Sequence, residues 1–190
     1  MHGTYNSVSA SWVQPKGTCD NGDTYAAFWV GLDGDGSDSV EQLGSEVDCD
    51  GSTPEYYAWY EMYPAYPVNF SNTVKPGDHF TASVSASGST FTLKISDTTE
   101  GWSKTETKSS SSAEKASAEI IAEAPYSDEV LPLTDFGVVN FTNSMINGEP
   151  AGDYDPAGIN IVSDQGILTA TTSALSSGEN FSVTWESTGY

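Results

Sequence analysis

The sequence predicts an all-β fold, an antiparallel β-sandwich of two sheets, on three observations. Short runs in which apolar and polar residues alternate recur along the chain, and Ser, Thr, β-branched and aromatic residues dominate them. Turn sequences such as KPGD, ASGS and DGDG separate these runs, and helix signals are almost absent. The chain has 190 residues, which suits one domain with a sizeable core, so we expect residues 1–190 to form a single domain.

Each predicted strand is a short run in which side chains alternate between two faces, with turn residues at its ends. NSVSASWV opens the series, YAAFWVGL is almost wholly apolar, and HFTASVSA, TFTLKIS and ENFSVTWE alternate clearly. The low-complexity segment TKSSSSAEKAS is interpreted as a solvated hairpin connection. In chain order the predicted strands are 6–13, 25–32, 39–43, 56–63, 79–86, 90–96, 117–124, 135–142, 159–163 and 179–186.

The charge balance is strongly acidic, with 27 Asp and Glu, six Lys and no Arg, and a formal net charge of −21. Phosphate backbones and anionic lipids would repel such a chain, so we expect neither nucleic-acid nor membrane partners. No run of eighteen apolar residues predicts a membrane span. The charge fits either a solvated, secreted surface or adaptation to acid, where protonation removes the self-repulsion. Nothing indicates obligate oligomerisation, and we expect a monomer.

The two cysteines, Cys19 and Cys49, lie in Gly- and Asp-rich loops. Together with the distant His2 and His79 they make a poor zinc set, so a disulfide is favoured. A disulfide indicates an oxidising compartment, and we expect a secreted protein whose signal peptide lies outside this chain. The acidic DGDGSD sequence does not fit the EF-hand spacing, because Gly44 stands at the twelfth position. We expect neither a metal nor a cofactor.

The stretch YYAWYEMYP places a single carboxylate within an aromatic strand. Alternation puts Tyr57, Trp59, Glu61 and Tyr63 on one face, which suits the wall of a groove that grips an extended ligand. The other face is expected to be core, and it consists of Tyr56, Ala58, Tyr60 and Met62.

Three further segments carry a carboxylate or an amide on an otherwise apolar strand. For each of them the simplest interpretation is a strand with one wet face. Familiar catalytic sets are missing, because the chain has neither a Gly-x-Ser-x-Gly elbow nor an Asp-Thr-Gly or Asp-Ser-Gly motif. The residues singled out are Trp29 with Asp33 in AFWVGLDG, Gln42 opposite Glu41 and Leu43 in SVEQLGS, and Glu119 with Glu123 in SAEIIAEAP.

Taken in this order, FWVGLDG, VEQLGS, YYAWYEMYP and AEIIAEAP resemble the glutamic peptidases, the eqolisin or G1 family, over most of the chain. The resemblance implies a secreted, pepstatin-insensitive acid endopeptidase on a concanavalin- or lectin-like sandwich of two long antiparallel sheets. It implies that Gln42, which opens a Gln-x-Gly turn, and Glu123, the second acid of an Ala-Glu-x-x-x-Glu strand, are the catalytic pair. Other family positions that line or support the cleft match Trp29, Asp33, Trp59 and Glu61, and Glu119 is the first acid of its strand.

Two features depart from that family pattern. Similar members carry an Asn-Trp-Gly/Ser-Gly segment before the first strand, whereas this chain starts with MHGTY, and the usual propeptide is missing too. Tyr57 stands where fungal members often have an acid, which bears on the hydrogen bonding around the site and on the pH optimum.

The implied roles agree with the chemistry of amide hydrolysis, which needs a base, an acid and a donor for the oxyanion. Glu123 can act as base and then as acid, while the Gln42 amide donates at any pH and accepts from water. Glu61 would orient its neighbours. Two alternatives remain open: a non-catalytic carbohydrate-binding module that presents the aromatic face to sugars, and a glycoside hydrolase that uses Glu61 and Glu123 as its carboxylate pair.

Overall fold

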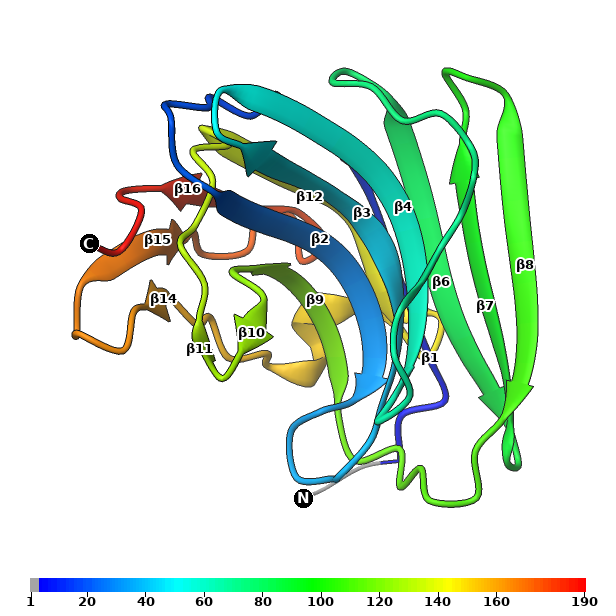
Figure 1. The fold of residues 1–190 in the computed structure, drawn as a ribbon. Helices are drawn as coiled ribbons and strands as arrows, with labels where there is room; N and C mark the ends of the chain where they lie inside the picture. The colour runs from blue at the N-terminus through cyan, green and yellow to red at the C-terminus, as the bar shows by residue number, and fades with distance from the viewer. Residues whose placement is uncertain (1–3) are drawn as a thin grey trace.

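The computed structural model describes residues 4–190 and consists almost entirely of β-strands (Figure 1). The single helical turn in this part of the chain is the 3₁₀ helix Ala151–Tyr154, and no described helix is long and apolar enough to cross a membrane. The strands are β1 Ser7–Val13, β2 Thr24–Asp33, β3 Val40–Asp50, β4 Thr53–Tyr63, β5 Val68–Asn69, β6 His79–Ser87, β7 Thr90–Asp97, β8 Trp102–Ser109, β9 Ala118–Glu123, β10 Tyr126–Ser127, β11 Glu129–Val130, β12 Val138–Ile146, β13 Glu149–Pro150, β14 Ile161–Val162, β15 Leu168–Thr172 and β16 Phe181–Trp185.

Most of the strands form two large antiparallel sheets, which confirms the predicted two-sheet sandwich, and β10 pairs with β11 separately. The smaller sheet has the order β5-β4-β3-β2-β9, and the larger has the order β14-β15-β16-β12-β1-β6-β7-β8, with β13 paired to β12. Figure 1 shows the long strands β2, β3 and β4 curving side by side, with β1 and β12 of the larger sheet passing behind them. The smaller sheet matters most for function, because it carries nearly all the residues singled out above.

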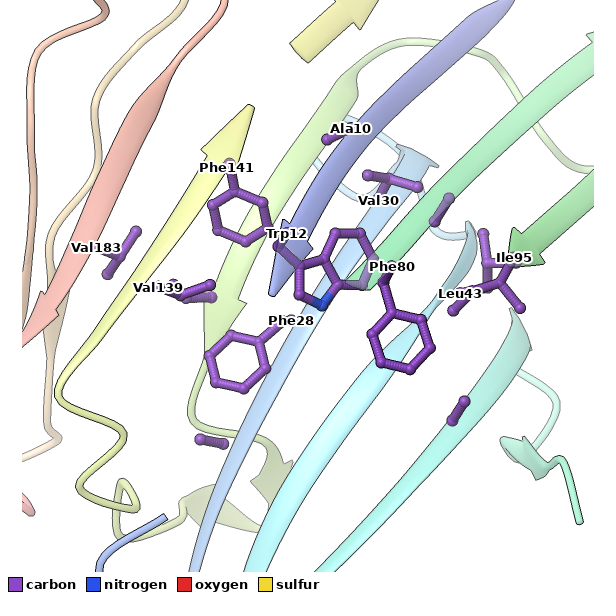
Figure 2. Close-up of a cluster of buried hydrophobic side chains, with 14 of the residues drawn as sticks. Ala10, Trp12, Phe28, Val30, Leu43, Phe80, Ile95, Val139, Phe141 and Val183 are labelled. Atoms are coloured by element: carbon purple, nitrogen blue, oxygen red, sulfur yellow. The ribbon is translucent and has the colours of Figure 1, made fainter. Parts of the chain in front are cut away.

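The core lies between the two sheets and orients the smaller one. Phe28 of β2 lies on the inner face of the smaller sheet and is fully buried. The larger sheet meets it with Trp12, Phe80 and Phe141, and the Trp12 ring lies 5.8 Å from the rings of both phenylalanines (Figure 2). Burying each such side chain contributes about 1.5–3 kcal/mol. Successive residues of a strand point in opposite directions. The residues that alternate with Phe28 and the other core residues of the smaller sheet therefore point away from the core.

A disulfide joins Cys19 to Cys49, with 5.4 Å between the Cα atoms, which confirms the predicted pairing. It ties the end of β3 to the loop that follows β1.

Several strand predictions differ from the structure. Strand β3 continues seven residues beyond the predicted end at Leu43. Neither β8 nor β15 was predicted. Strand β8, WSKTETKS, has no apolar alternation because it forms the exposed edge of the larger sheet. The interpretation of TKSSSSAEKAS as a hairpin connection is wrong. Its first residues end β8, and the rest crosses from the edge of the larger sheet to β9 at the edge of the smaller one.

Candidate active site

The candidate site lies on the face of the smaller sheet that turns away from the core, which we call the site face. Strand register aligns its residues in rows across β4, β3, β2 and β9. The first row contains Glu61, Gln42, Gly31 and Glu119 in that order. Side chains in one row are neighbours, so a residue of β4 can contact a residue of β3 that lies 19 positions away in the sequence.

Gln42 and Glu61 are joined by a hydrogen bond within this row. The Gln42 Nε2 atom donates to Glu61 Oε2 at 2.6 Å, and Gln42 is only 8% exposed. Burial raises the pKa of the Glu61 carboxyl, and the amide donor partly opposes that effect. An amide has two N–H donors and a carbonyl acceptor, so one N–H of Gln42 remains for another partner. Its buried Oε1 atom has no hydrogen-bond partner among residues 4–190.

The indole of Trp29 contacts Glu123 and covers Gly31, which pairs with Gln42 in the sheet. Its Nε1 atom donates to Glu123 Oε2 at 2.8 Å. The other end of the ring covers Gly31, where an added Cβ would lie 2.9 Å from Trp29 Cζ3 and 3.1 Å from Gln42 Cβ. The ring therefore extends from the carboxyl on β9 toward the strand position beside Gln42.

Gly44, the glycine of the Gln-x-Gly motif, allows this packing. A Cβ atom there would lie 2.1 Å from the Phe28 carbonyl oxygen and 2.6 Å from Trp29 Cβ. Such distances are far below van der Waals contact, so no larger residue fits without moving β2. The resemblance had implied that this motif forms a turn, but the motif lies inside strand β3.

The row that contains Trp29 and Gly44 is followed by one that contains Tyr57, Glu46, Ala27 and Glu123. Ala27 is small, which leaves room between the carboxyls of Glu46 and Glu123 on either side of it. Burial raises the pKa of Glu123, the Trp29 N–H opposes this, and the negative charge of Glu61 adds to the increase. Glu123 thus holds its proton more strongly than an exposed glutamate does.

Glu46 and Asp48 complete an acidic cluster beside Glu123. Burial, reinforced by the charge of Asp48, raises the pKa of Glu46 to about 9. The Tyr57 hydroxyl donates to Asp48 Oδ2 at 2.7 Å, and burial raises the pKa of this phenol, which therefore stays neutral. Sequence reasoning missed both acids because the predicted third strand ended at Leu43. Had the predicted strand been extended along β3, alternation would have placed Glu46 and Asp48 on the same face as Gln42 and Gly44.

Glu119, at the end of the site face, and Asp33, beyond it, both accept hydrogen bonds from backbone N–H groups. Glu119 Oε1 accepts the Asp35 backbone N–H at 3.0 Å and the Ser117 hydroxyl at 3.1 Å, and burial raises its pKa to about 7. Asp33 is fully buried, and its carboxylate accepts hydrogen bonds from the backbone of residues 114–116. Asp33 thus lies away from the site face and supports the segment that precedes β9.

The structure joins four of the predicted site residues in two hydrogen-bonded pairs on the site face, Trp29 with Glu123 and Gln42 with Glu61. Trp59 packs against Trp29 and Ala27 in a small cluster on the site face. Tyr63 lies at the end of β4 and is 51% exposed. His2, one of the two histidines weighed for zinc, lies outside the described residues. Within residues 4–190 no three His, Cys, Asp or Glu side chains gather in a metal-binding arrangement.

Two known proteins match most of this chain in sequence. The chain is 32% identical to aspergillopepsin-2 of Aspergillus niger over 169 residues, which cover 84% of this chain and 59% of that protein. It is 31% identical to scytalidopepsin B of Scytalidium lignicola over 159 residues, which cover 80% of this chain and 55% of that protein. The chain therefore spans less than two thirds of the length of these relatives.

Solved structures show the same fold. A scytalido-glutamic peptidase bound to a transition state analog inhibitor superposes with a TM-score of 0.84 at 25% identity, covering 98% of this chain and 95% of that one. The aspergilloglutamic peptidase of Aspergillus niger gives a TM-score of 0.76 at 32% identity, covering 86% and 99%. The model of the Peptidase A4 family matches residues 1–185. The resemblance inferred from four motifs is thereby confirmed, and the chain belongs to the Peptidase A4 family, the eqolisin or glutamic peptidases.

Proposed function

We propose that this protein is a secreted endopeptidase that hydrolyses polypeptides in acid, with Gln42 and Glu123 acting on one water molecule. The observation that carries the proposal is the contact set around Trp29. This ring donates to Glu123 at one end and covers Gly31, the residue paired with Gln42, at the other, while Glu61 holds the Gln42 amide. The amide and the carboxyl are therefore both held by hydrogen bonds on the site face.

The reaction needs few groups. The Glu123 carboxylate takes a proton from water, and the water oxygen attacks the peptide carbonyl carbon. The N–H of Gln42 that Glu61 does not use donates to the developing oxyanion, and losing one such donor typically costs about 10²–10³ in rate. Glu123 then gives its proton to the leaving nitrogen as the C–N bond breaks, which restores the carboxylate.

The electrostatics of Glu123 suit both of its roles. Burial and the charge of Glu61 raise its pKa, which makes the carboxylate a stronger base than an exposed glutamate. The Trp29 N–H stabilises the charged form and so opposes part of this increase. Gln42 does not titrate and keeps its donor at every pH.

We further infer that residues 1–190 act as one monomeric domain outside the cell, without a cofactor. The Cys19–Cys49 disulfide supports an oxidising compartment. The formal charge of −21 supports solubility as separate molecules.

The test is cleavage of denatured casein and of a quenched peptide at pH 3–5 with pepstatin present. We expect cleavage by the natural chain, none by Glu123→Gln at an unchanged melting temperature, and none by Gln42→Glu, which places a titrating group where a neutral donor is needed. Glu149→Gln, at an exposed position on β13, is the charge-matched control and should cleave normally. Retained cleavage by Glu123→Gln would remove Glu123 from the mechanism. Binding or hydrolysis of a polysaccharide without proteolysis would favour the carbohydrate alternatives.

A further inference from the structure

A second pair of carboxyls, Asp33 and Glu41, lies outside the site face and has no part in the proposed mechanism. Asp33 ends β2 with a positive φ of 67° and is fully buried. Its carboxylate accepts three backbone N–H groups, from Glu114 at 3.1 Å, Lys115 at 2.9 Å and Ala116 at 2.8 Å. Through these three hydrogen bonds Asp33 anchors the backbone of residues 114–116.

Glu41 lies on the core side of β3, in register between Leu32 of β2 and Met62 of β4. Its exposed fraction is 0%, and neither of its carboxyl oxygens has a hydrogen-bond partner among residues 4–190. The two ion pairs described in that part of the chain do not include it. A buried carboxyl without partners is far more stable as the neutral acid than as the anion.

Asp33 is the charged neighbour that acts on Glu41. Burial raises the pKa of Glu41 to about 7, the Asp33 carboxylate adds to the increase, and the nearby hydroxyls of Ser39 and Ser110 partly offset it. Lys115, on the anchored segment, places its ammonium group on the Gly88 carbonyl oxygen. When Glu41 ionises, two carboxylates therefore lie close together without a cation, an arrangement that only entry of water or movement of the backbone can relieve.

The backbone that Asp33 anchors leads directly into β9. The Asp33 N–H donates to the Ser117 carbonyl oxygen at 3.0 Å, and the Ser117 hydroxyl donates to Glu119 at 3.1 Å. Strand β9 is an edge strand, paired in the sheet with β2 alone, and Glu123 is its last residue. Release of residues 114–117 would thus loosen the start of the strand that carries the proposed catalytic acid.

We propose that Glu41 is a proton-dependent positioning residue. While Glu41 is neutral, Asp33 holds residues 114–117, the segment that precedes β9. When Glu41 ionises toward neutral pH, this segment is released and Glu123 is displaced. The consequence for catalysis rests on the proposed function; the release of the segment does not. The effect develops between the ordinary pKa of about 4.5, which applies in the open form, and the raised value of about 7 in the closed form. Over that range the equilibrium constant for opening should rise up to about 300-fold and then level off.

Hydrogen exchange of residues 110–117, followed by mass spectrometry from pH 4 to 8 and corrected for intrinsic rates, tests the release. We expect the natural chain to lose protection in this segment between pH 4.5 and 7 while β2 stays protected. Glu41→Gln should keep protection in the segment, and so should Glu41→Leu. The control Glu149→Gln also removes one carboxylate, and it should follow the natural chain.

Peptide cleavage provides the second measurement. Glu41→Gln should equal the natural chain in kcat/KM at pH 4 and retain a larger fraction of that value at pH 6.5. The proposal is overturned if Glu41→Gln loses protection at the same pH as the natural chain. It is also overturned if this variant fails to fold at pH 4, where a neutral amide should replace a neutral acid. If exchange differs as expected but no variant cleaves peptides, the proposed function fails and the control of this segment by Glu41 stands.

Discussion

The substitution Trp29→Phe removes the hydrogen bond to the proposed catalytic acid and keeps an aromatic ring in place. Trp29 is 5% exposed, and its Nε1 atom donates to Glu123 Oε2 at 2.8 Å. The chain offers a matched control, because Trp59 is 6% exposed in the same small cluster and its buried Nε1 atom has no partner among residues 4–190. Trp59→Phe therefore removes the same atoms without removing a hydrogen bond.

The magnitude follows from the charge on the acceptor. A hydrogen bond to a charged group contributes about 1.5–3 kcal/mol, and 1.36 kcal/mol corresponds to a tenfold change in an ionisation constant. The Trp29 N–H favours the ionised form of Glu123, so its loss should raise the pKa of Glu123. If the ionised carboxyl is the base, the acid limb of the kcat/KM profile should move to higher pH, and kcat/KM on that limb should fall about 10- to 100-fold.

The assay is the pH dependence of kcat/KM from pH 2 to 7 for a quenched peptide, measured for the natural chain, Trp29→Phe and Trp59→Phe. Melting temperatures at pH 4 show whether the two variants lose similar stability from the smaller ring. We expect the acid limb to move in Trp29→Phe and to stay in place in Trp59→Phe. Equal acid limbs in all three proteins would show that this indole N–H does not set the ionisation of Glu123.

Three further predictions concern stability. Gly44→Ala should cost at least about 3 kcal/mol of stability or prevent folding, because its Cβ would meet a backbone oxygen at 2.1 Å. The control is Gly22→Ala, whose Cβ would have no atom within 4 Å. Similar urea midpoints for the two variants would contradict the packing argument. Reducing the Cys19–Cys49 disulfide, which closes a separation of 30 residues, should cost about 3–4 kcal/mol in the chain-entropy model, as read from the urea midpoint with and without reductant. The raised pKa values of Glu46 and Glu119 mean that the folded chain holds more protons than the unfolded chain above about pH 4.5, so stability should fall as pH rises from 4.5 to 7. A urea midpoint that is constant or rises over that range would show that the sign is wrong.

Local alternation was sufficient to predict which residues share a face. Tyr57, Trp59 and Glu61 lie together on the site face, and Ala58 lies in the core, as predicted. These assignments depend on the two-residue repeat of a pleated strand, which is a property of consecutive residues. Strand β8 escaped prediction for the same reason, since an exposed edge strand of Lys, Glu, Ser and Thr carries no apolar repeat.

The fold class, most of the strands, the disulfide and, through motif resemblance, the family could thus be predicted from the residues alone. Three contacts could not: Gln42 donates to Glu61, Trp29 reaches Glu123 across 94 positions, and Glu41 lies buried near Asp33. These contacts arise because strand register and the packing of two sheets join residues far apart in the chain. A local repeat specifies the direction of a side chain, but the neighbour it meets depends on which strands pair and at which residue.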